Sequence, residues 1–452
     1  MQITELYDIF QKSTGISTDT RAIKPGNIFF ALKGDRFNGN FFAEKALLAG
    51  AIAVVVDEQP VTVNEKLILV ENVLSTLQKL ANHHRNRLQT KIIAVAGSNG
   101  KTTTRELINA VFQTSFKTFS TKGNFNNHIG VPLSLLSIDH PAKPPSLFNR
   151  DGISPLPIEK EFAVIEMGAN HSGETKLLCE IAEPDFGLIT NNGKDHLEGY
   201  GSIEGVRKGN GELYDFLREK NRIAFVCADE DDLVQMSEGM NRITYGKSET
   251  ANCRGKIEEL FPFLRIKLTT HELSRYNRDS RLTTQLIGKY NFENVMAAVC
   301  IGNYFGITDE KIKQAIESYS PTSNRSQIVK RGTNTFILDA YNANPSSMNA
   351  ALENFFALPE ENKIAILGDM AELGTVSEKE HREVISKLKI SKLKMRILVG
   401  DEFRKVLSDS DKSFLHFKNV GQLKEWFGKQ IFENHFFLLK ASRVIGLEKL
   451  IE

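Results

Sequence analysis

Residues 91–104 read KIIAVAGSNGKTTT, an apolar run that stops at a glycine-containing turn and continues into a segment with helical periodicity. Residues 92–96 suit a buried strand, because they form a short continuous apolar run that a turn signal ends. The apolar face of the following helix is supplied by Leu107, Ile108, Val111 and Phe112. A strand, a glycine-containing loop and a helix in this order predict a phosphate-binding loop in an α/β domain, and therefore ATP or GTP as ligand.

The string GSNGKT (97–102) carries the chemistry of this loop. Two glycines let the backbone approach an anion, the lysine can reach the terminal phosphates, and the threonine hydroxyl can bind Mg²⁺. The more common spacing has a glycine where Val95 stands, so this is the shorter G-x-x-G-K-T form. A plain strand–turn–helix connection is the alternative reading of the string. The predicted phosphate-loop residues are Gly97, Ser98, Asn99, Gly100, Lys101, Thr102 and Thr103.

Chain length and charge limit the possible functions. A chain of 452 residues is too long for one ordinary core, and its length suggests about three domains. Lys and Arg number 57 against 56 Asp and Glu, a net charge of +1. This balance provides no basic surface for a polyanion, so nucleic acid is not expected as a partner.

The cysteines and the apolar runs indicate the compartment. Four cysteines are widely spaced without a C-x-x-C pair, which is typical of reduced, buried thiols in a cytosolic protein. The N-terminal stretch MQITELYDIFQKSTG contains acidic residues and is no signal peptide, and no run approaches the ~18 apolar residues of a membrane span. We expect a soluble, cytoplasmic, monomeric protein without membrane insertion.

Alternating strand and helix patterns predict an α/β chain of three domains, with boundaries at 1–85, 86–321 and 322–452. The central domain should have a mostly parallel sheet that carries the phosphate loop, and the last domain a doubly wound, Rossmann-like pattern. A proline-rich stretch, 140–157, is expected to be a surface insertion. The further predicted strands are 27–32, 51–56, 67–70, 162–166, 186–190, 222–226, 336–338, 363–367, 396–399 and 436–439.

Several ordered strings resemble one family, the Mur ligases of peptidoglycan synthesis. The strings are GSNGKTTT, GNFNNHIGVPLSLL (123–136), EMGANHSGE (166–174), NNGKDHLEGYGS (191–202), GKYNFENVMAA (288–298), LDAYNANPSSM (338–348), LGDMAELG (367–374) and KASR (440–443). Within the family, NNHIGVPL, YNANP and GDMAELG resemble the branch that acts on a UDP-linked muramoyl tripeptide and D-alanyl-D-alanine. The segment 17–42 resembles the domain that binds the UDP end of that substrate.

The resemblance implies an ADP-forming, ATP-dependent ligase. ATP would phosphorylate the free carboxylate of UDP-N-acetylmuramoyl-tripeptide, and the amine of D-Ala-D-Ala would attack the acyl phosphate to form an amide, in the last cytoplasmic step of muropeptide assembly. Phosphorylation supplies the leaving group that a carboxylate lacks. Lys101 and Mg²⁺ would neutralise the approach of a carboxylate to a triphosphate.

Two residues after the loop are predicted to be catalytic together with Lys101. Glu166 ends the apolar run FAVIE, at the strand end where α/β proteins bind ligands, and is expected to bind the metal together with Thr102. The resemblance makes His196 a ligand of a second Mg²⁺, although a loop histidine is more often a solvated or packing residue. Asp195 could orient the imidazole or could be an ordinary turn residue, and the sequence leaves both open.

Four residues are predicted to complete the ATP site. Asn291 and Asn294, three apart at a helix start, can face one ligand and read the adenine edge; a helix cap plus a surface asparagine is the alternative. Arg325 is a candidate phosphate clamp in a linker, where arginines are usually solvated. Asp339, at the end of the run FILD, would bind ribose or act at a hinge, unless it only caps its strand.

The substrate residues are assigned by the same resemblance. Amide groups suited to a dipeptide and a peptide carboxylate are provided by Asn126, Asn127, Asn342 and Asn344. Turn chemistry around Pro345 is the alternative explanation for Asn344. Ser17, Asp19 and Arg21 would contact the uracil, ribose or diphosphate of the substrate. The acidic-Gly-His string usual in the family is here 38–40, Asn-Gly-Asn, which departs from the pattern of a uridine site.

A second departure lies in GVRKGNGELY (205–214). The resemblance places Asn210 where the family usually has a lysine whose carbamate helps to hold the second Mg²⁺. Lys208 is no simple substitute, because two residues along a helix turn a side chain by roughly 200°. Either Asn210 or another oxygen ligand takes this role, or the second metal binds more weakly.

Two other functions remain as alternatives. Folylpolyglutamate synthase uses the same acyl-phosphate route, but a pterin-binding loop is not evident and the first domain resembles a uridine-binding one. A non-catalytic ATP-binding descendant is suggested by Asn210, whereas Lys101, Thr102, Glu166 and His196 argue for an enzyme.

Overall fold

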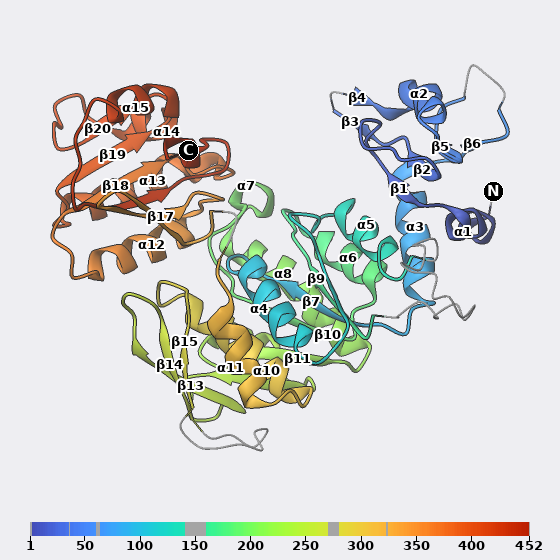
Figure 1. Cartoon of the computed structure of the whole chain (residues 1–452), viewed down its shortest axis with the longest axis horizontal. Helices are drawn as coiled ribbons and strands as arrows, with labels where there is room; N and C mark the ends of the chain where they lie inside the picture. Colours follow the sequence, from blue (N-terminus) through green and yellow to red (C-terminus); the bar gives the residue numbers. More distant parts are fainter. Residues whose placement is uncertain are drawn as a thin grey trace, which may run out of the picture.

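The computed structural model describes residues 2–35, 37–59, 64–140, 160–269, 280–321 and 324–451. Three domains are visible in Figure 1: the N-terminal domain (blue) and the C-terminal domain (orange to red) stand on either side above the central domain. Nearly all of the proline-rich stretch lies outside the described residues, so its prediction as a surface insertion stays a prediction.

The N-terminal domain contains a four-stranded parallel sheet of order β1-β2-β5-β6. All four residues of β2 (Asn27–Phe30) and of β5 (Ala53–Val56) are buried, which explains why continuous apolar runs predicted these strands correctly. The remaining elements are α1 (Ile3–Lys12), β1 (Gly15–Ser17), β3 (Lys33–Gly34), β4 (Phe37–Asn38), η1 (Gly39–Phe42), α2 (Ala43–Leu48), β6 (Leu67–Leu69) and α3 (Val73–Arg85).

The central sheet has nine strands in the order β15-β14-β13-β12-β11-β10-β7-β9-β8. From β8 to β13 all neighbours are parallel, and β14 is antiparallel to both of its neighbours, β13 and β15. Its strands are β7 (Lys91–Ala96), β8 (Thr118–Ser120), β9 (Phe162–Glu166), β10 (Phe186–Ile189), β11 (Ile223–Cys227), β12 (Arg242–Gly246), β13 (Cys253–Glu259), β14 (Arg265–Thr269) and β15 (Arg281–Thr283). The mostly parallel sheet predicted for this domain is confirmed.

The strand before the phosphate loop lies inside this sheet, between β10 and β9. Residues 92–96 are buried, as are the four predicted apolar residues of the next helix, so both elements pack into one core. The helices of the domain are α4 (Lys101–Gln113), α5 (Gly130–Leu136), α6 (Glu174–Ala182), α7 (Leu197–Tyr200), α8 (Ile203–Glu219), α9 (Asp231–Met236), α10 (Asn291–Tyr304) and α11 (Asp309–Ser318).

The C-terminal domain has a six-stranded sheet of order β16-β17-β21-β18-β19-β20, parallel except at β16. Residues of α12, α13 and α14 form a core on one face, and residues of α15 and η3 form the core on the other, so the predicted doubly wound pattern is confirmed. The elements are β16 (Gln327–Arg331), β17 (Asn334–Asp339), α12 (Pro345–Ala357), β18 (Lys363–Gly368), η2 (Gly374–Val376), α13 (Ser377–Lys389), β19 (Met395–Val399), α14 (Asp401–Val406), β20 (Leu415–Phe417), α15 (Val420–Phe427), β21 (Phe436–Lys440) and η3 (Leu447–Leu450).

All four cysteines are buried, as predicted, and burial raises the pKa of the Cys179 and Cys227 thiols far above the ordinary value. Among the described residues, no helix combines the length and the apolar character that crossing a membrane requires.

Candidate active site between the central and C-terminal domains

The phosphate loop connects β7 to α4, and two of its glycines are required by its shape. Gly97 has φ +116° and Gly100 has φ +84°, in the left-handed region that side chains disfavour. A Cβ on Gly97 would lie 2.3 Å from Thr190 Oγ1, and one on Gly100 would lie 2.5 Å from Asn294 Oδ1. Any larger residue would therefore push the loop away from the elements that support it.

Asn191, which follows β10, holds the phosphate loop through two hydrogen bonds. Its carbonyl accepts the Ser98 N–H at 2.9 Å and its Oδ1 accepts the Asn99 N–H at 3.1 Å. Lys101 folds back over the loop, where its ammonium donates to the carbonyls of Gly97 and, at 2.9 Å, of Ser98. The loop is thus shaped by hydrogen bonds, and the lysine charge lies directly over it.

Glu166 reaches the same loop because β9 is hydrogen-bonded to β7, with Val95 opposite Glu166 in the register. Its carboxylate is 2 % exposed and accepts the Thr102 hydroxyl at 3.1 Å and the Asn126 amide at 2.9 Å, both on Oε1. Arg105 Nε lies 3.1 Å from Oε2 but outside hydrogen-bond geometry, so this contact is an ion pair without an aligned hydrogen bond.

The donor set at Glu166 suits a hard cation. Mg²⁺ is commonly bound by one or two protein oxygens and completes its shell with phosphate and water oxygens. The Thr102 hydroxyl and the Glu166 carboxylate converge beside the loop and offer such a pair. A carboxylate oxygen without an aligned donor, Oε2, is a further feature that a cation would satisfy.

His196 lies at the junction of the two domains, in a left-handed conformation with φ +47°. Its Nδ1 contacts the Glu372 carboxylate of the C-terminal domain, and its Nε2 lies 3.6 Å from Asp195 Oδ2. Burial lowers the pKa of His196, but the hydrogen bond to Glu372 and the two negative charges outweigh it, and the net shift is upward. No contact joins His196 to Thr102 or Glu166 in the described chain, so its role as a metal ligand stays a prediction.

Further contacts join the C-terminal domain to the central one. Asn344 Nδ2 donates to Asn99 Oδ1 of the phosphate loop at 2.9 Å, and Ser346 Oγ accepts the Lys194 N–H at 2.7 Å. Lys194 Nζ also lies 2.7 Å from Glu380 Oε1, whose side chain is 4 % exposed. These residues were missed by sequence reasoning apart from Asn99 and Asn344, although Lys194 lies within a motif quoted for the family.

Asn291 and Asn294 both lie at the start of α10, buried, and face the α4 end of the loop. Asn294 Nδ2 donates to Asn291 Oδ1 at 2.9 Å, and Asn294 Oδ1 accepts the Thr104 hydroxyl at 3.0 Å. Asn291 Nδ2 donates to the Ile287 carbonyl. The two residues thus contact each other as the spacing predicted, and their contact with adenine stays a prediction.

Asp339 and Arg325 lie where the chain enters the C-terminal domain. Asp339 Oδ1 accepts the Ser326 N–H at 3.2 Å, and Oδ2 accepts Lys440 Nζ at 2.7 Å. Arg325 lies over the ring of Tyr341, with Cζ 3.7 Å from the ring centre. Lys440 was not predicted as a site residue, and its position in KASR is the signal that could have indicated it.

The predicted substrate asparagines have local partners in the structure. Asn127 Oδ1 accepts the N–H groups of Ile129 and Gly130, and Asn344 caps α12 by accepting the Ser347 N–H. Turn and cap chemistry therefore accounts for one oxygen of each, while the Asn126 amide is bound to Glu166. The carbonyl of Asn342 accepts Lys440 Nζ at 3.2 Å. Their substrate roles stay predictions.

The predicted uridine residues lie together at the start of the N-terminal domain. Asp19 forms a two-pronged ion pair with Arg21, which lowers the Asp19 pKa to about 2, and Ser17 Oγ donates to the Asp19 carbonyl. Asn40 belongs to the Asn-Gly-Asn string that departs from the family pattern. Its amide oxygen accepts the Asp57 N–H, and its amide nitrogen donates to the Asp57 carboxylate. The amide of Asn40 is thus bound within the domain.

Asn210 is buried in α8, whereas Lys208 is exposed, so the two side chains lie on opposite faces as predicted. Asn210 Nδ2 donates to Asn192 Oδ1 at 2.9 Å, and Asn192 Nδ2 donates to Asp232 Oδ2 at 2.8 Å. The amide of Asn210 is therefore part of a short polar chain.

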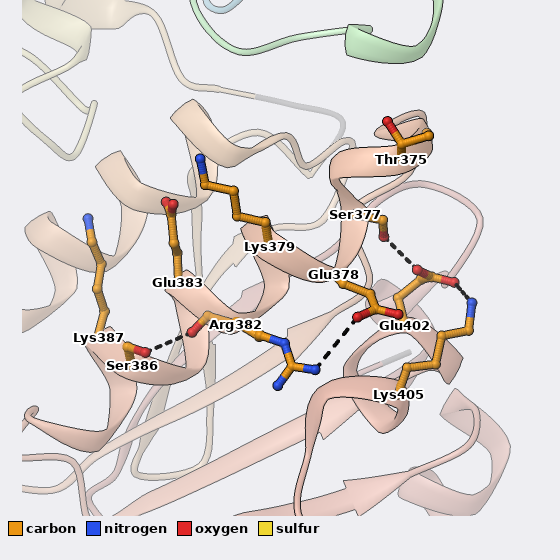
Figure 2. A pocket seen from close by; sticks show the side chains of 11 residues that line it. Thr375, Ser377, Glu378, Lys379, Arg382, Glu383, Ser386, Lys387, Glu402 and Lys405 are labelled. Carbon is orange, nitrogen blue, oxygen red and sulfur yellow. Dashed lines mark hydrogen bonds and ion pairs between the residues drawn. The ribbon is translucent and has the colours of Figure 1, made fainter.

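A surface hollow of about 990 Å³ lies elsewhere on the C-terminal domain, along α13 (Figure 2). Several of its side chains pair with one another: Arg382 with Glu378 at 3.6 Å, and Glu402 with Ser377 and Lys405. None of the predicted site residues lines it. The candidate active site is therefore the junction at the phosphate loop and not this hollow.

Comparisons with known families match most of the chain. Residues 12–85 match the model described as Mur ligase family, catalytic domain; 95–302 match the Mur ligase middle domain; and 324–443 match the Mur ligase, glutamate ligase domain.

Two curated relatives carry the name UDP-N-acetylmuramoyl-tripeptide–D-alanyl-D-alanine ligase. The one from Bacillus subtilis (strain 168) is 33 % identical, over 97 % of this chain and 92 % of its own. The one from Escherichia coli (strain K12) is 30 % identical, over 96 % of this chain and 92 % of its own.

Solved structures agree in fold. A crystal structure of MurF from Acinetobacter baumannii superposes with a TM-score of 0.84 at 26 % identity, over 100 % of this chain and 97 % of its own. A folylpolyglutamate synthase from Thermotoga maritima has a TM-score of 0.58 at 12 % identity, over 83 % of this chain and 91 % of its own, which is a likeness of fold alone.

Proposed function

Because the chain belongs to the Mur ligase family, we propose that it joins D-alanyl-D-alanine to the free carboxylate of UDP-N-acetylmuramoyl-tripeptide, at the expense of ATP, in peptidoglycan synthesis. The observation that carries the proposal is full-length similarity, at 33 % and 30 % identity, to two ligases named for that reaction. The phosphate loop and Glu166 meet at the junction of two domains, as an ATP-dependent ligase requires.

The chemistry proceeds by activation and transfer. A carboxylate oxygen of the tripeptide attacks the γ-phosphorus of ATP, the bond to the β-phosphate bridging oxygen breaks, and ADP leaves. The dipeptide amine attacks the acyl carbon, and the tetrahedral intermediate collapses as the nitrogen loses a proton and the carbon–oxygen bond to phosphate breaks. The products are the amide, ADP and inorganic phosphate.

The residues of the site act mainly on charge and position. Lys101, now bound to carbonyls of its own loop, would turn to the terminal phosphates and reduce the repulsion between triphosphate and carboxylate. Thr102 and Glu166 would hold a bound Mg²⁺, which supplies further neutralisation of the triphosphate. Arg325 and Asp339 are assigned to phosphate and ribose, and the pair Asn291 and Asn294 to adenine.

Eight further residues complete the proposed site. His196 is assigned to the second metal ion. The contacts with the two substrates are assigned to Ser17, Asp19, Arg21, Asn126, Asn127, Asn342 and Asn344. We assign UDP binding to the domain of residues 1–85, ATP binding to the domain of residues 86–321 and binding of the amine to the domain of residues 322–452. ATP and UDP-linked precursors suggest a cytoplasmic enzyme, and we propose that it acts as a monomer.

Phosphate release from ATP tests the function. Release should need both UDP-N-acetylmuramoyl-tripeptide and D-Ala-D-Ala, and mass spectrometry should find the pentapeptide product. Turnover with a folate and glutamate, but not with these substrates, would favour the folylpolyglutamate alternative. ATP binding without turnover on either pair would favour a non-catalytic descendant.

A further inference from the structure

Three strand ends of the C-terminal sheet meet at one place. β21 lies between β17 and β18. After β17 and β18 the chain enters α12 and α13, which pack on one face; after β21 it enters η3, which packs on the other. Open α/β sheets bind ligands outside the carboxyl ends of strands whose connections diverge in this way. The residues just beyond β17 and β21 are thus in position for a ligand.

The guanidinium groups of Arg325 and Arg443 both lie near the ring of Tyr341, beyond the carboxyl ends of these strands. Tyr341 follows β17, and Arg325 Cζ lies 3.7 Å from the centre of its ring. Arg443 follows β21; its Cζ lies 5.3 Å from the same centre, and its Nη1 lies 3.5 Å from the Tyr341 hydroxyl. In the described part of the chain, neither guanidinium forms an ion pair with a carboxylate. Arg443 is exposed to solvent, and two positive charges beside one ring favour the binding of an anion there.

The backbone on either side of Tyr341 is held by its neighbours. Lys440 Nζ donates to the Asn342 carbonyl and to Asp339, and Asn344 is bound to Asn99 of the phosphate loop. The loop that carries Tyr341 is therefore ordered before a substrate arrives, which lowers the entropy cost of binding. Tyr341 is three residue steps from Asn344, so their Cα atoms are at most about 11 Å apart and Tyr341 belongs to the loop that contacts the phosphate loop.

We propose that Arg443, stacked on Tyr341, binds the C-terminal carboxylate of the incoming D-alanyl-D-alanine. The inference rests on the proposed function and adds the group that recognises the acceptor. Arginine presents a planar fork that matches a carboxylate, and stacking on an aromatic ring fixes its plane. An extended dipeptide spans about 7 Å from amine to carboxylate, so this anchor requires the acyl phosphate to form about that far from Arg443.

Steady-state kinetics of the full chain test the proposal. Arg443→Ala should raise the KM for D-Ala-D-Ala by about 10- to 100-fold, the worth of a hydrogen bond to a charged group, and leave the KM values for ATP and UDP-muramoyl-tripeptide within about twofold. Arg443→Lys should recover only part of the loss. The matched control is Arg382→Ala, an exposed arginine on α13, which should behave as wild type.

D-Ala-D-Ala amide, which lacks the carboxylate charge, tests the same contact without relying on a variant. Wild type should discriminate against the amide by a factor similar to the Arg443→Ala effect, and Arg443→Ala should use both acceptors almost equally. Wild type that accepts the amide as well as the acid, or a variant that keeps the discrimination, would overturn the assignment. A rise in the KM for ATP alone would also overturn it, since the anion would then be a nucleotide phosphate. If wild type shows no turnover with D-Ala-D-Ala at all, the proposed function fails first.

Discussion

Lys440 and Asp339 form an ion pair between two adjacent parallel strands, with Nζ 2.7 Å from Oδ2. The two residues are register partners on β21 and β17, and the Lys440 side chain is 2 % exposed. The same ammonium donates to the Asn342 carbonyl at 3.2 Å. One buried charge therefore supports both the proposed ribose ligand and the loop that carries Tyr341.

Lys440→Met should destabilise the C-terminal domain by about 3 kcal/mol, because it leaves the carboxylate of Asp339 without its partner in a mostly buried position. Hydrogen exchange of the β17 and β21 amides would measure the loss within this domain. Adding Asp339→Asn should restore part of the stability but not the activity. Equal protection of these strands in Lys440→Met and wild type would show that the pair contributes nothing.

Lys101→Ala should reduce turnover by at least about 10³-fold while the thermal unfolding curve stays nearly unchanged. The loop is shaped by its glycines and by Asn191, and the lysine acts on the charge that is transferred. Phosphate release at saturating ATP and circular dichroism on the same sample give the two readouts. A variant with near wild-type rate would contradict the phosphate-loop assignment.

Strands buried on both faces were predictable because they are continuous apolar runs: β9 has five buried residues and was predicted at its observed bounds. The antiparallel extension β13 to β15 was missed, since CRGKIEE in β13 is half exposed and carries charges at the positions an apolar run would fill. The position of Glu166 beside the loop was predictable because Glu166 ends a strand next to β7. The partners Glu372 and Glu380 lie 176 and 186 residues from His196 and Lys194 in the chain, and nothing local in the sequence indicates such contacts.

The C-terminal domain should lose stability in mild acid because of His381. Its Nδ1 donates to the Ser377 carbonyl and its Nε2 accepts the Met370 N–H, so protonation would break the second bond. Burial lowers the pKa of His381 below the ordinary 6.5. The unfolded chain therefore binds the proton first as pH falls, and stability, full above about pH 6.5, declines below it.

The decline should approach about 1.4 kcal/mol per pH unit until the folded histidine is protonated. Melting curves of wild type and His381→Gln at pH 7.5 and 5.5 check this, since glutamine does not titrate. The wild type should lose more on acidification than the variant does. Identical pH dependence in both proteins would assign the acid sensitivity to another group.

The central and C-terminal domains should close further on each other when the substrates bind, because an acyl phosphate exposed to water would hydrolyse. The connection between α11 and β16, where Asn324 and Ser326 adopt left-handed φ values of +58° and +52°, is the expected hinge. Small-angle scattering with an ATP analogue and UDP-muramoyl-tripeptide should show a smaller radius of gyration than the free protein. An unchanged radius would count strongly against closure.

Asn210 presents a neutral amide at the position where the resemblance to the family places a lysine. Hard cations favour anionic oxygens, so a second Mg²⁺ should bind more weakly here than in a lysine-bearing relative, while the site at Thr102 and Glu166 is little changed. Phosphate release should need more Mg²⁺ than in that relative and be indifferent to bicarbonate.

Asn210→Lys should lower the Mg²⁺ requirement and introduce bicarbonate dependence, provided that the longer side chain fits beside Asn192, which now accepts the Asn210 amide at 2.9 Å. Lys208→Asn, an exchange on the exposed face of the same helix, is the matched control and should change neither quantity. If wild type already saturates at low Mg²⁺ and Asn210→Lys gains nothing, another residue supplies the missing ligand. Asn192 and Asp232, which continue the polar chain from Asn210, would then be the first side chains to replace.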